Sequence, residues 1–353
     1  MADNGGKTAG DGGGEARAVT TLTKKDFTSD QEVRWCPGCG DYAILAAMQS
    51  FLPELGIPPH ETVFISGIGC SSRFPYYLNS YGVHSIHGRA PTLATGVATA
   101  KPKLSVWVIT GDGDGLSIGG NHLIHALRRN VNLKIVLFNN QIYGLTKGQY
   151  SPTSELGKVT KSTPFGSLDH PFNPVALALG SEASFVARSI DVDRQHLTGV
   201  LRRAAAHRGA AFVEVYQNCN IFNDGAFEDL TSKEGKVDNQ IRLEHGRPIR
   251  FGPDGSKGVR LTDHASLEIV DVAEVGEGAL LLHDEHREEP SLAFMLAHIA
   301  TSPHSPTPIG VFRDVERAVY GEAMEAQITA ATENLGAGEI GKLLRSGDTW
   351  QID

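Results

Sequence analysis

The stretch SVWVITGDGDG, residues 105–115, decides the fold of this chain, because a β-branched run ends there in a loop of alternating glycine and aspartate. A second β-branched run, KIVLFN, begins at Lys134 and is closed by Asn139 and Asn140. In a β-α-β unit this interval returns the chain to the same carboxyl edge of the sheet, where open α/β folds gather their ligands. The sequence therefore predicts that Asp112 and Asn140 meet at that edge.

The chemistry of these two loops suits a metal ion that also holds a diphosphate. Carboxylate, amide and backbone carbonyl oxygens are hard donors of the kind that Mg²⁺ prefers. Gly111, Gly113 and Gly115 would let the backbone approach a phosphate closely. A G-D-G sequence alone is a common turn, and it is the paired asparagines that favour a cofactor site.

The same alternation of strands and helices extends to both sides of this unit. Further β-branched runs start at Thr62 and Phe212, and helices are predicted near residues 41–52, 90–100, 117–129 and 193–207. This pattern predicts an α/β fold with a parallel sheet flanked by helices over residues 30–230. Residues 1–25 are predicted to be a disordered leader, and residues 231–353 a C-terminal extension with a helix near 316–334.

The chain has only four cysteines. Cys36 and Cys39 form a C-P-G-C pair, Cys70 lies in G-I-G-C-S-S-R, and Cys219 stands alone. Four thiolates suit a [4Fe-4S] cluster or a tetrahedral zinc ion. The alternative is that two of them are buried apolar residues and the C-P-G-C pair is accidental.

Composition restricts the environment and the partners of the protein. The chain has 353 residues, 40% of them hydrophobic, and a formal net charge of -9. This charge argues against nucleic acid or an anionic membrane as the main partner. We expect a cytoplasmic protein, since no apolar stretch approaches the ~20 residues that span a bilayer and the N-terminus has no apolar signal core. In a reducing compartment, so few cysteines favour metal ligation or catalysis over disulfides.

Taken together, these motifs resemble a known family. The G-D-G and N-N pair resembles the diphosphate-binding motif of thiamine diphosphate enzymes. The cysteines resemble those of the β subunit of 2-oxoacid:ferredoxin oxidoreductases, most closely the 2-oxoglutarate type of actinobacteria. The match runs from about Trp35 to Phe227 and includes W-C-P-G-C-G, G-I-G-C-S-S-R, H-G-R, G-D-G-D and Y-G-L-T. It implies the thiamine diphosphate-binding fold, in its diphosphate-type domain, for residues 30–230.

The resemblance also implies roles for individual residues. The four cysteines, Cys36, Cys39, Cys70 and Cys219, would ligate one [4Fe-4S] cluster. Mg²⁺ would be bound by the side chains of Asp112 and Asn140 and by the carbonyl of Ile142. The residues expected around thiamine diphosphate are Gly67, Ile68, Gly69, Ser71, Ser72, His87, Gly111, Asp112, Gly113, Asp114, Asn140, Ile142, Gly144, Leu145 and Thr146. The loop around Cys70 would then serve both the cluster and the cofactor.

Three residues are expected to act on the substrate or the cofactor. By resemblance, His87 would contact the diphosphate or manage a proton, and Leu145 would help to set the acceptable chain length of the substrate. Arg73 stands where relatives often have lysine, and its planar fork would give a dicarboxylic 2-oxoacid a bidentate grip. For Arg73 the alternative is a surface ion pair, and the nearby His84 is as well explained as a structural histidine. Lys147 departs from the family, in which many members have glycine at this position.

The activity that the resemblance implies is the oxidative decarboxylation of 2-oxoglutarate. Coenzyme A would be the co-substrate, succinyl-CoA and CO2 the products, and ferredoxin the electron acceptor that receives electrons through the cluster. The reverse reaction would use the same site. We find no pyrimidine-binding domain in the sequence, and the family supplies that domain from a separate α subunit. The expected working unit is therefore a dimerised αβ complex in which residues 231–353 contact the partner.

Other activities remain open from the sequence. The substrate can be pyruvate or a branched-chain 2-oxoacid. The protein can also be a non-redox, thiamine-dependent decarboxylase with zinc in the cysteine site, or a non-catalytic subunit whose metal only stabilises the fold.

Overall fold

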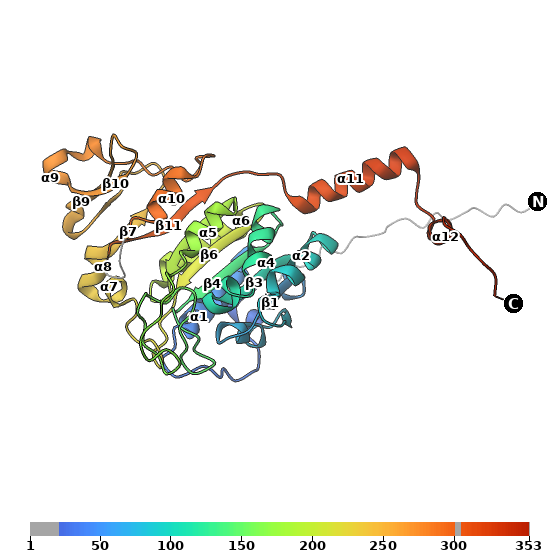
Figure 1. The fold of residues 1–353 in the computed structure, drawn as a ribbon, viewed down its shortest axis with the longest axis horizontal. Helices are drawn as coiled ribbons and strands as arrows, with labels where there is room; N and C mark the ends of the chain where they lie inside the picture. The colour runs from blue at the N-terminus through green and yellow to red at the C-terminus, as the bar shows by residue number, and fades with distance from the viewer. Residues whose placement is uncertain (1–20, 301–304, 353) are drawn as a thin grey trace, which may run out of the picture.

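A central sheet forms the core of the computed structural model, which describes residues 21–300 and 305–352 (Figure 1). Within these residues the sheet has eight strands, in the order β2 (Tyr81–His84), β1 (Thr62–Ser66), β3 (Ser105–Gly111), β4 (Lys134–Asn139), β6 (Ala211–Tyr216), β5 (Phe185–Ile190), β11 (Thr307–Asp314) and β7 (Gln240–Leu243). All neighbours are parallel except β5 and β11, which are antiparallel. The predicted parallel sheet is confirmed, with β11 as its exception.

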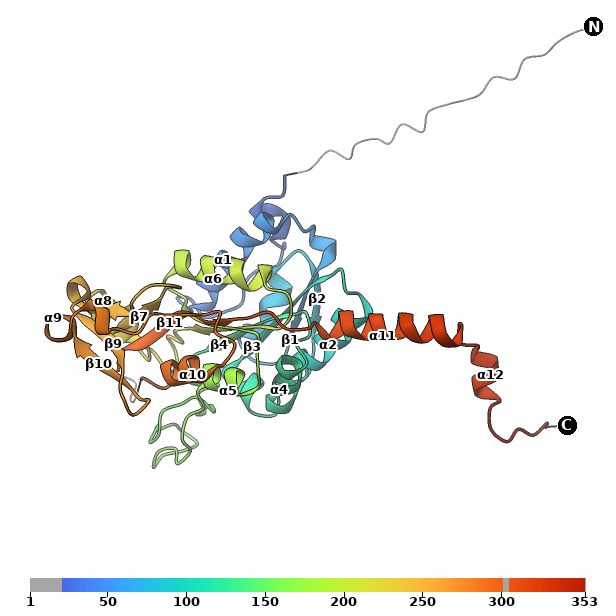
Figure 2. The same ribbon diagram turned by 90° about the horizontal axis from the view of Figure 1, so that it is seen from above.

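Helices cover both faces of the sheet (Figure 2). One face is covered by α1 (Asp41–Phe51) and α6 (Arg194–Ala206), and the other by α2 (Ala90–Ala100), α4 (Gly120–Arg128), α5 (Pro174–Gly180) and α10 (Ser291–Ala297). Alternate strand residues supply the two cores. Phe64 and Trp107 pack with the α1 and α6 residues, whereas Ile65 and Val108 pack with those of α2 and α4. Burial on both sides explains why these strands are continuous β-branched and aromatic runs.

The predicted helices near 41–52, 90–100, 117–129 and 193–207 correspond to α1, α2, α4 and α6. The third begins later than predicted, because a short helix, α3 (Asp112–Leu116), precedes it. The remaining turns are 3-10 helices, η1 (Lys24–Phe27), η2 (Leu52–Leu55), η3 (Pro59–Glu61), η4 (Ser71–Tyr77), η5 (Pro253–Gly255) and η6 (Glu277–Ala279). Of the predicted leader, residues 1–20 lie outside the described residues, and η1 begins near its end.

The chain after residue 230 is partly built into the sheet, since β7 and β11 both come from it. It also carries the helices α7 (Glu228–Thr231), α8 (Lys233–Asn239) and α9 (Val272–Val275), and an antiparallel sheet of β8 (Arg250–Phe251), β9 (Lys257–Leu261) and β10 (Leu267–Asp271). The predicted helix near 316–334 is α11 (Tyr320–Leu335), which projects from the body with α12 (Ile340–Leu344) (Figure 1). No helix in residues 21–300 and 305–352 has the length and apolar character needed to cross a membrane.

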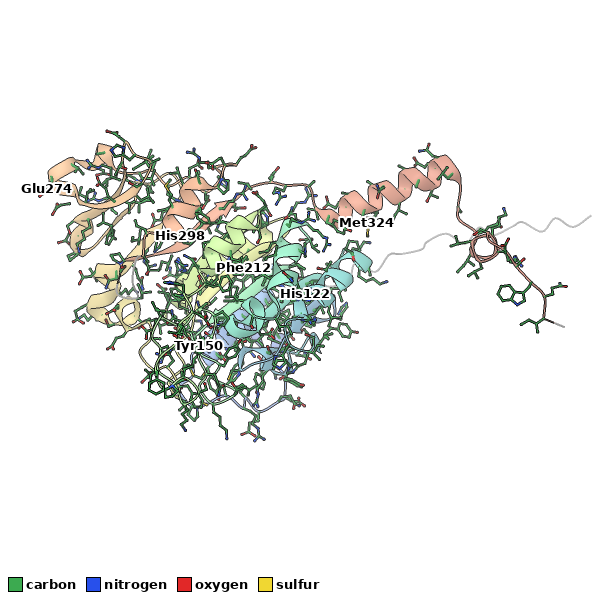
Figure 3. The ribbon with its side chains drawn as sticks, in the orientation of Figure 1. His122, Tyr150, Phe212, Glu274, His298 and Met324 are labelled. Carbon is green, nitrogen blue, oxygen red and sulfur yellow. The ribbon has the colours of Figure 1, made fainter. Side chains whose placement is uncertain are left out.

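The carboxyl ends of β1, β3, β4 and β6 point to one edge of the sheet, where the glycine-rich, asparagine-rich and cysteine-bearing loops gather. Figure 3 shows Tyr150 among these loops, with Phe212 inside the sheet and Met324 on the arm at the other end. The fold thus positions the predicted site away from α11.

Candidate active site

A cavity opens at this edge of the sheet, between the loops that follow β1, β3 and β4. It is lined by Ile68, Gly69, Cys70, Ser71, His87, Gly111, Asp112, Gly113, Asp114, Phe138, Asn140, Ile142, Tyr143, Gly144, Leu145 and Thr146. The structure therefore brings most of the predicted cofactor residues together. Gly67 and Ser72 lie outside this lining, and so does Arg73.

Asp112 is the first residue of α3 and is only 2% exposed. The hydroxyls of Ser151 and Thr153 donate hydrogen bonds to its Oδ2 atom, the second at 2.6 Å. Burial raises the pKa of Asp112 to about 6, and these hydrogen bonds act in the opposite direction. Because the two side-chain donors are neutral, a bound cation would stabilise this carboxylate further. The donor set thus fits a divalent cation such as Mg²⁺.

Asn140 lines the same cavity as Asp112. Its Oδ1 atom accepts a hydrogen bond from the backbone N–H of Ile142 (3.2 Å), and its Nδ2 atom donates to Oε1 of Gln217 (2.9 Å). The intervening Gln141 has a φ of 55°, in the left-handed region, so the chain turns sharply between them. The predicted meeting of Asp112 and Asn140 at the sheet edge is present in the structure.

Asp114 organises the loops around the cavity. Its buried carboxylate accepts hydrogen bonds from the backbone N–H groups of Ile68 (3.1 Å) and Gly88 (2.7 Å). Gly67 passes so close that a Cβ atom there would lie 1.7 Å from Oδ2 of Asp114. His87, which lines the cavity and has a side chain 67% exposed, places its Nδ1 atom 4.0 Å from Oδ1. Asp114 thus fixes the positions of the two loops that would enclose a cofactor.

Two buried serine hydroxyls follow Cys70. Among the described residues, the Oγ atoms of Ser71 and Ser72 have no hydrogen-bond partner. Ser71 lines the cavity, whereas Ser72 does not. An unpaired buried hydroxyl costs about 1–3 kcal/mol, so a ligand that supplies a partner to Ser71 would gain affinity from it.

The four cysteines come from three loops that meet beside the cavity. The loop of Cys36 and Cys39 is tied to the loop of Cys219 by two hydrogen bonds, from Gly40 N–H to the carbonyl of Asn218 (3.2 Å) and from Asn220 Nδ2 to the carbonyl of Pro37 (2.7 Å). The indole of Trp35 donates to the carbonyl of Cys70 at 2.7 Å. Residues distant in the sequence are thereby held in one place.

Gly144 lies next to two of the sulfurs. A Cβ atom at Gly144 would lie 3.5 Å from Sγ of Cys219 and 3.6 Å from Sγ of Cys70. Burial, and then the nearby Asp41, raise the pKa of Cys70 to about 12 and also raise the pKa of Cys39. Such thiols ionise readily only when a metal binds them, because the metal supplies the compensating charge.

The two metal centres that the sequence allows differ in the sulfur spacing that they require. Zinc bound tetrahedrally at 2.3 Å would bring its thiolates to about 3.8 Å from one another. Within the described residues, the sole group of three or more metal-ligating atoms that all lie within 4.8 Å of one another is that of His245, Glu285 and His286. No three of the cysteine sulfurs, all of which belong to the described residues, therefore lie within 4.8 Å of one another.

Arg73 is not brought to the cavity. Its Nη1 atom donates to the carbonyl of Arg34 (3.1 Å), and its side chain lines a separate hollow with Tyr76 and His84. Its predicted grip on a substrate carboxylate stays a prediction. Leu145 is 46% exposed at the cavity. Lys147 has a φ of 74°, so it adopts the left-handed conformation that glycine, common here in the family, takes without strain.

Sequence reasoning missed three residues that support this site, namely Ser151, Thr153 and Gln217. The S-P-T-S stretch from Ser151 was visible only as part of a loop. Thr153, which donates to Asp112, is 41 positions away from it in the sequence. A contact between such distant residues leaves no spacing pattern that the sequence could reveal. Gln217 lies just after a predicted strand, and its closeness in sequence to Cys219 was the one available sign that it belongs to the site.

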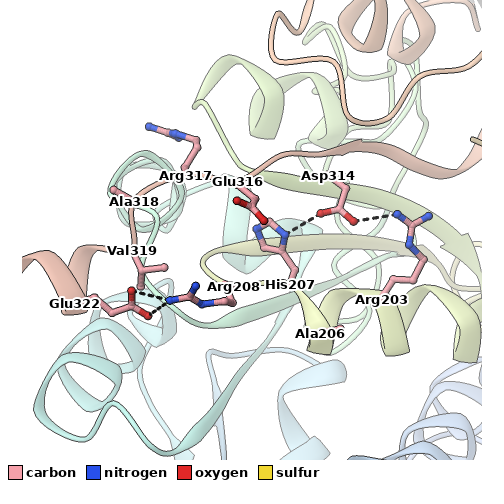
Figure 4. A pocket seen from close by; sticks show the side chains of 10 residues that line it. All are labelled: Arg203, Ala206, His207, Arg208, Asp314, Glu316, Arg317, Ala318, Val319 and Glu322. Atoms are coloured by element: carbon pink, nitrogen blue, oxygen red, sulfur yellow. Dashed lines mark hydrogen bonds and ion pairs between the residues drawn. The ribbon is translucent and has the colours of Figure 1, made fainter.

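A second cavity lies between α6 and the start of α11 (Figure 4). Five of its charged or titratable side chains are paired with one another, namely Arg203, His207, Arg208, Asp314 and Glu322. Asp314 accepts hydrogen bonds from His207 and from Arg203, both at 2.9 Å, and Arg208 pairs with Glu322 at 2.8 Å. The Arg208–Glu322 pair connects α11 to the body of the protein, whereas the pairs of Asp314 join the end of β11 to the end of α6.

Comparisons with known proteins agree with the geometry of the first cavity. Residues 67–215 match the family model of the thiamine pyrophosphate enzyme C-terminal TPP binding domain. The chain is 59% identical to the 2-oxoglutarate oxidoreductase subunit KorB of Mycobacterium tuberculosis over 93% of its own length and 88% of that protein. It is 47% identical to the 2-oxoacid:ferredoxin oxidoreductase subunit beta of Saccharolobus solfataricus, over 54% of this chain and 63% of that protein.

A solved structure is also similar. The 2-oxoglutarate:ferredoxin oxidoreductase of Magnetococcus marinus, solved with 2-oxoglutarate, coenzyme A and succinyl-CoA bound, aligns with a TM-score of 0.73 and 31% identity. The alignment covers 94% of this chain and 98% of that one.

Proposed function

The chain belongs to the β subunits of the 2-oxoacid:ferredoxin oxidoreductases, and we propose that it is the β subunit of an enzyme that acts on 2-oxoglutarate. The reaction is the coenzyme A-dependent oxidative decarboxylation of 2-oxoglutarate to succinyl-CoA and CO2. The relatives named for 2-oxoglutarate, and the neighbour solved with 2-oxoglutarate and succinyl-CoA, support this substrate. Pyruvate and branched-chain 2-oxoacids are the competing substrates.

One observation carries the proposal. The glycine- and aspartate-rich loop, the asparagine loop and Cys70 line a single cavity, and the sulfurs of Cys70 and Cys219 both lie beside Gly144, which lines it too. A cofactor at this wall would have a redox centre as its immediate neighbour. Two-electron oxidation of a 2-oxoacid through one-electron carriers needs such an adjacency.

Different residues of the cavity are proposed to bind the metal ion and the diphosphate. Asp112, Asn140 and the carbonyl of Ile142 would hold Mg²⁺, since they present hard oxygens at one edge of the sheet. Gly111 and Gly113 leave the backbone open to a diphosphate. Bound thiamine diphosphate would supply an electron sink for the carbon that loses CO2. His87 faces this cavity with an exposed ring and would contact the diphosphate or move a proton.

The cysteines are proposed to hold a [4Fe-4S] cluster. Four thiolates from three loops that are tied together by hydrogen bonds support this cluster. Electrons would leave through it to ferredoxin, and Cys36 is the most exposed of the four. Coenzyme A is the acyl acceptor in this proposal.

A partner subunit completes the proposed enzyme. The names of the relatives describe subunits, and the cavity of this chain provides the diphosphate side of a thiamine site. An α subunit would supply the pyrimidine side, in an αβ dimer of dimers. Residues 231–353, including the projecting α11, are proposed to contact that partner.

The test is anaerobic co-purification with the α subunit, followed by reduction of a viologen dye in the presence of coenzyme A. We expect 2-oxoglutarate to be oxidised faster than pyruvate, and four iron and four sulfide per chain. The Cys70→Ala variant should lose iron and dye reduction together. A colourless protein with zinc, or a preference for pyruvate, would contradict the cluster or the substrate respectively.

A further inference from the structure

The side chain of Gln217 connects the two halves of the proposed site. It follows β6 and is 1% exposed. Its Oε1 atom accepts a hydrogen bond from Nδ2 of Asn140 at 2.9 Å. Its Nε2 atom donates to Sγ of Cys39 at 3.3 Å and to the carbonyl of Asn218 at 2.5 Å. One buried amide thus contacts both a proposed cluster ligand and a proposed Mg²⁺ ligand.

The orientation of this amide is fixed by its partners. The carbonyl of Asn218 can only accept a hydrogen bond, so it must face the Nε2 side of Gln217. Oε1 then faces Asn140 and requires the donor, Nδ2, on that side. As a result, the oxygen of Asn140 faces the Ile142 N–H, from which it accepts a hydrogen bond. Gln217 and the Ile142 N–H together fix the orientation of the Asn140 amide.

Packing leaves Gln217 no freedom to change this orientation. A Cβ atom at Gly40 would lie 3.0 Å from Cγ of Gln217, so the loop that follows Cys39 lies directly against the stem of the side chain. Glycine at position 40 is what permits this approach. The same loop carries Cys39, and its distance from Gln217 is set by the backbone as well as by the hydrogen bond.

We propose that Gln217 is a positioning residue that couples the cluster to the cofactor site, by donating to the Cys39 thiolate and by orienting the Asn140 oxygen. This inference rests on the proposed function, because it assigns a cluster to Cys39 and a metal ion to Asn140. It adds a residue that touches neither substrate nor cofactor and acts on both centres through other side chains.

The physical basis is the strength of hydrogen bonds to sulfur. An N–H donor to a ligating thiolate stabilises the more negative, reduced cluster and so raises its reduction potential. A cation on the oxygen of Asn140 polarises that amide and makes its Nδ2–H a stronger donor to Gln217. The polarised Gln217 amide then donates more strongly to Cys39, since hydrogen bonds in a chain reinforce one another. By linkage, a reduced cluster would in turn favour binding at Asn140.

Two substitutions separate the two contacts. Gln217→Glu keeps an oxygen that accepts from Asn140 and removes the donor to Cys39. Gln217→Leu removes both contacts. Gln240→Leu is the matched control, because Gln240 is also a buried glutamine, 5% exposed, whose Nε2 atom donates to a backbone carbonyl, that of Leu230, far from the site on β7.

The measurements are made on the αβ complex, purified anaerobically and without substrate. The midpoint potential of the cluster is measured by EPR-monitored titration with and without Mg²⁺ and thiamine diphosphate, and the affinity for thiamine diphosphate by calorimetry. We expect the equilibrium constant for reduction of the cluster to fall about tenfold in both Gln217 variants. For a one-electron couple this lowers the midpoint potential by about 59 mV. The rise in potential on cofactor binding should shrink in both. Affinity should fall about tenfold in Gln217→Leu and stay within threefold in Gln217→Glu.

Each outcome has a definite meaning. Loss of iron from both Gln217 variants, with full iron in Gln240→Leu and unchanged melting temperatures, would also support the hold of Gln217 on Cys39. Unchanged potentials in both variants, or a change at one centre alone in Gln217→Leu, would overturn the coupling. A wild-type complex without a cluster would instead overturn the proposed function, and the inference with it, whatever the variants do.

Discussion

The ring of Tyr143 occupies the space in which any side chain on Gly113 would stand. A Cβ atom at Gly113 would lie 2.1 Å from Cε1 of Tyr143, and the Tyr143 hydroxyl donates to the carbonyl of Gly113 at 3.1 Å. This contact joins α3, which begins with Asp112, to the loop that carries Asn140 and Ile142. Position 113 must be glycine, because the ring of Tyr143 leaves no room there for a Cβ atom.

Gly113→Ala should therefore displace Tyr143 and its loop. We expect the affinity for thiamine diphosphate to fall at least tenfold, and the free energy of unfolding to fall by about 1–3 kcal/mol, which is typical of overpacking. Calorimetric titration and urea unfolding measure the two effects. In Gly120→Ala the new methyl group meets no atom within 4 Å, so this control should keep both values. Normal cofactor affinity in Gly113→Ala would contradict the role of this contact.

Thr153 tests the support of the proposed metal ligand. Its hydroxyl lies 2.6 Å from Oδ2 of Asp112 and 2.9 Å from Oδ1 of Asn139. Thr153→Val keeps the shape and removes the hydroxyl, and we expect Mg²⁺ to bind 10–100-fold more weakly, the range typical of groups that orient metal ligands. Thr153→Ser keeps the hydroxyl and should bind Mg²⁺ nearly as the wild type does. Equal affinities for the Val and Ser variants would show that the hydroxyl has no such role.

Ser71 and Ser72 form a matched pair for a test of the cavity wall. Both hydroxyls are buried without a partner in the described residues, and only Ser71 lines the cavity. Ser71→Ala should weaken cofactor binding about tenfold, the value of one hydrogen bond, and leave the unliganded protein as stable as before or more so. Ser72→Ala should have the same effect on stability and none on cofactor binding. Weaker binding in both variants would point to a general distortion of η4.

Asp314 predicts how acid affects the contact between β11 and the end of α6. Burial pushes the pKa of Asp314 upward, but hydrogen bonds from His207 and Arg203 outweigh it and hold the pKa below its ordinary value. A carboxylate with a lowered pKa contributes stability above its unfolded pKa of about 4, and this contribution is lost as the pH falls through the folded pKa.

Asp314→Asn should lower the free energy of unfolding by about 1–3 kcal/mol at pH 7. The difference from the wild type should shrink as the pH falls below about 4. Urea unfolding at pH 7, 5 and 3 measures this dependence. Asp263→Asn, at an exposed position in the turn between β9 and β10, serves as the control. A difference that stays constant from pH 7 to pH 3 would exclude a charge-based contribution.

The sequence could predict the pairing of Asp112 with Asn140, because the geometry of a β-α-β unit fixes which loops share an edge. It could also predict β1, β3, β4 and β6, whose residues are buried on both faces. It could not predict β5, since this strand contains Arg188. The charge of Arg188 is buried only because Glu214, 26 positions away, accepts its hydrogen bond at 2.6 Å.

Strand β11 was missed for a related reason. Its sequence, TPIGVFRD, contains Pro308, Gly310 and Arg313, which favour a loop, and the strand forms because β5 and β7 pair with it. Within the site, the cysteine and aspartate motifs were visible because they are local. The hydroxyls on Asp112 and the amide of Gln217 were not, because each depends on a contact between distant segments.

The most direct test of the central claim is an EPR measurement on the oxidised αβ complex in the absence of ferredoxin. If the cluster and the cofactor share one wall of the cavity, adding 2-oxoglutarate and coenzyme A to the complex with Mg²⁺ and thiamine diphosphate will produce the signal of a reduced [4Fe-4S] cluster. The signal should be absent when thiamine diphosphate is omitted. A protein that contains zinc in place of iron, or a cluster that stays oxidised when substrate is consumed, would contradict the account.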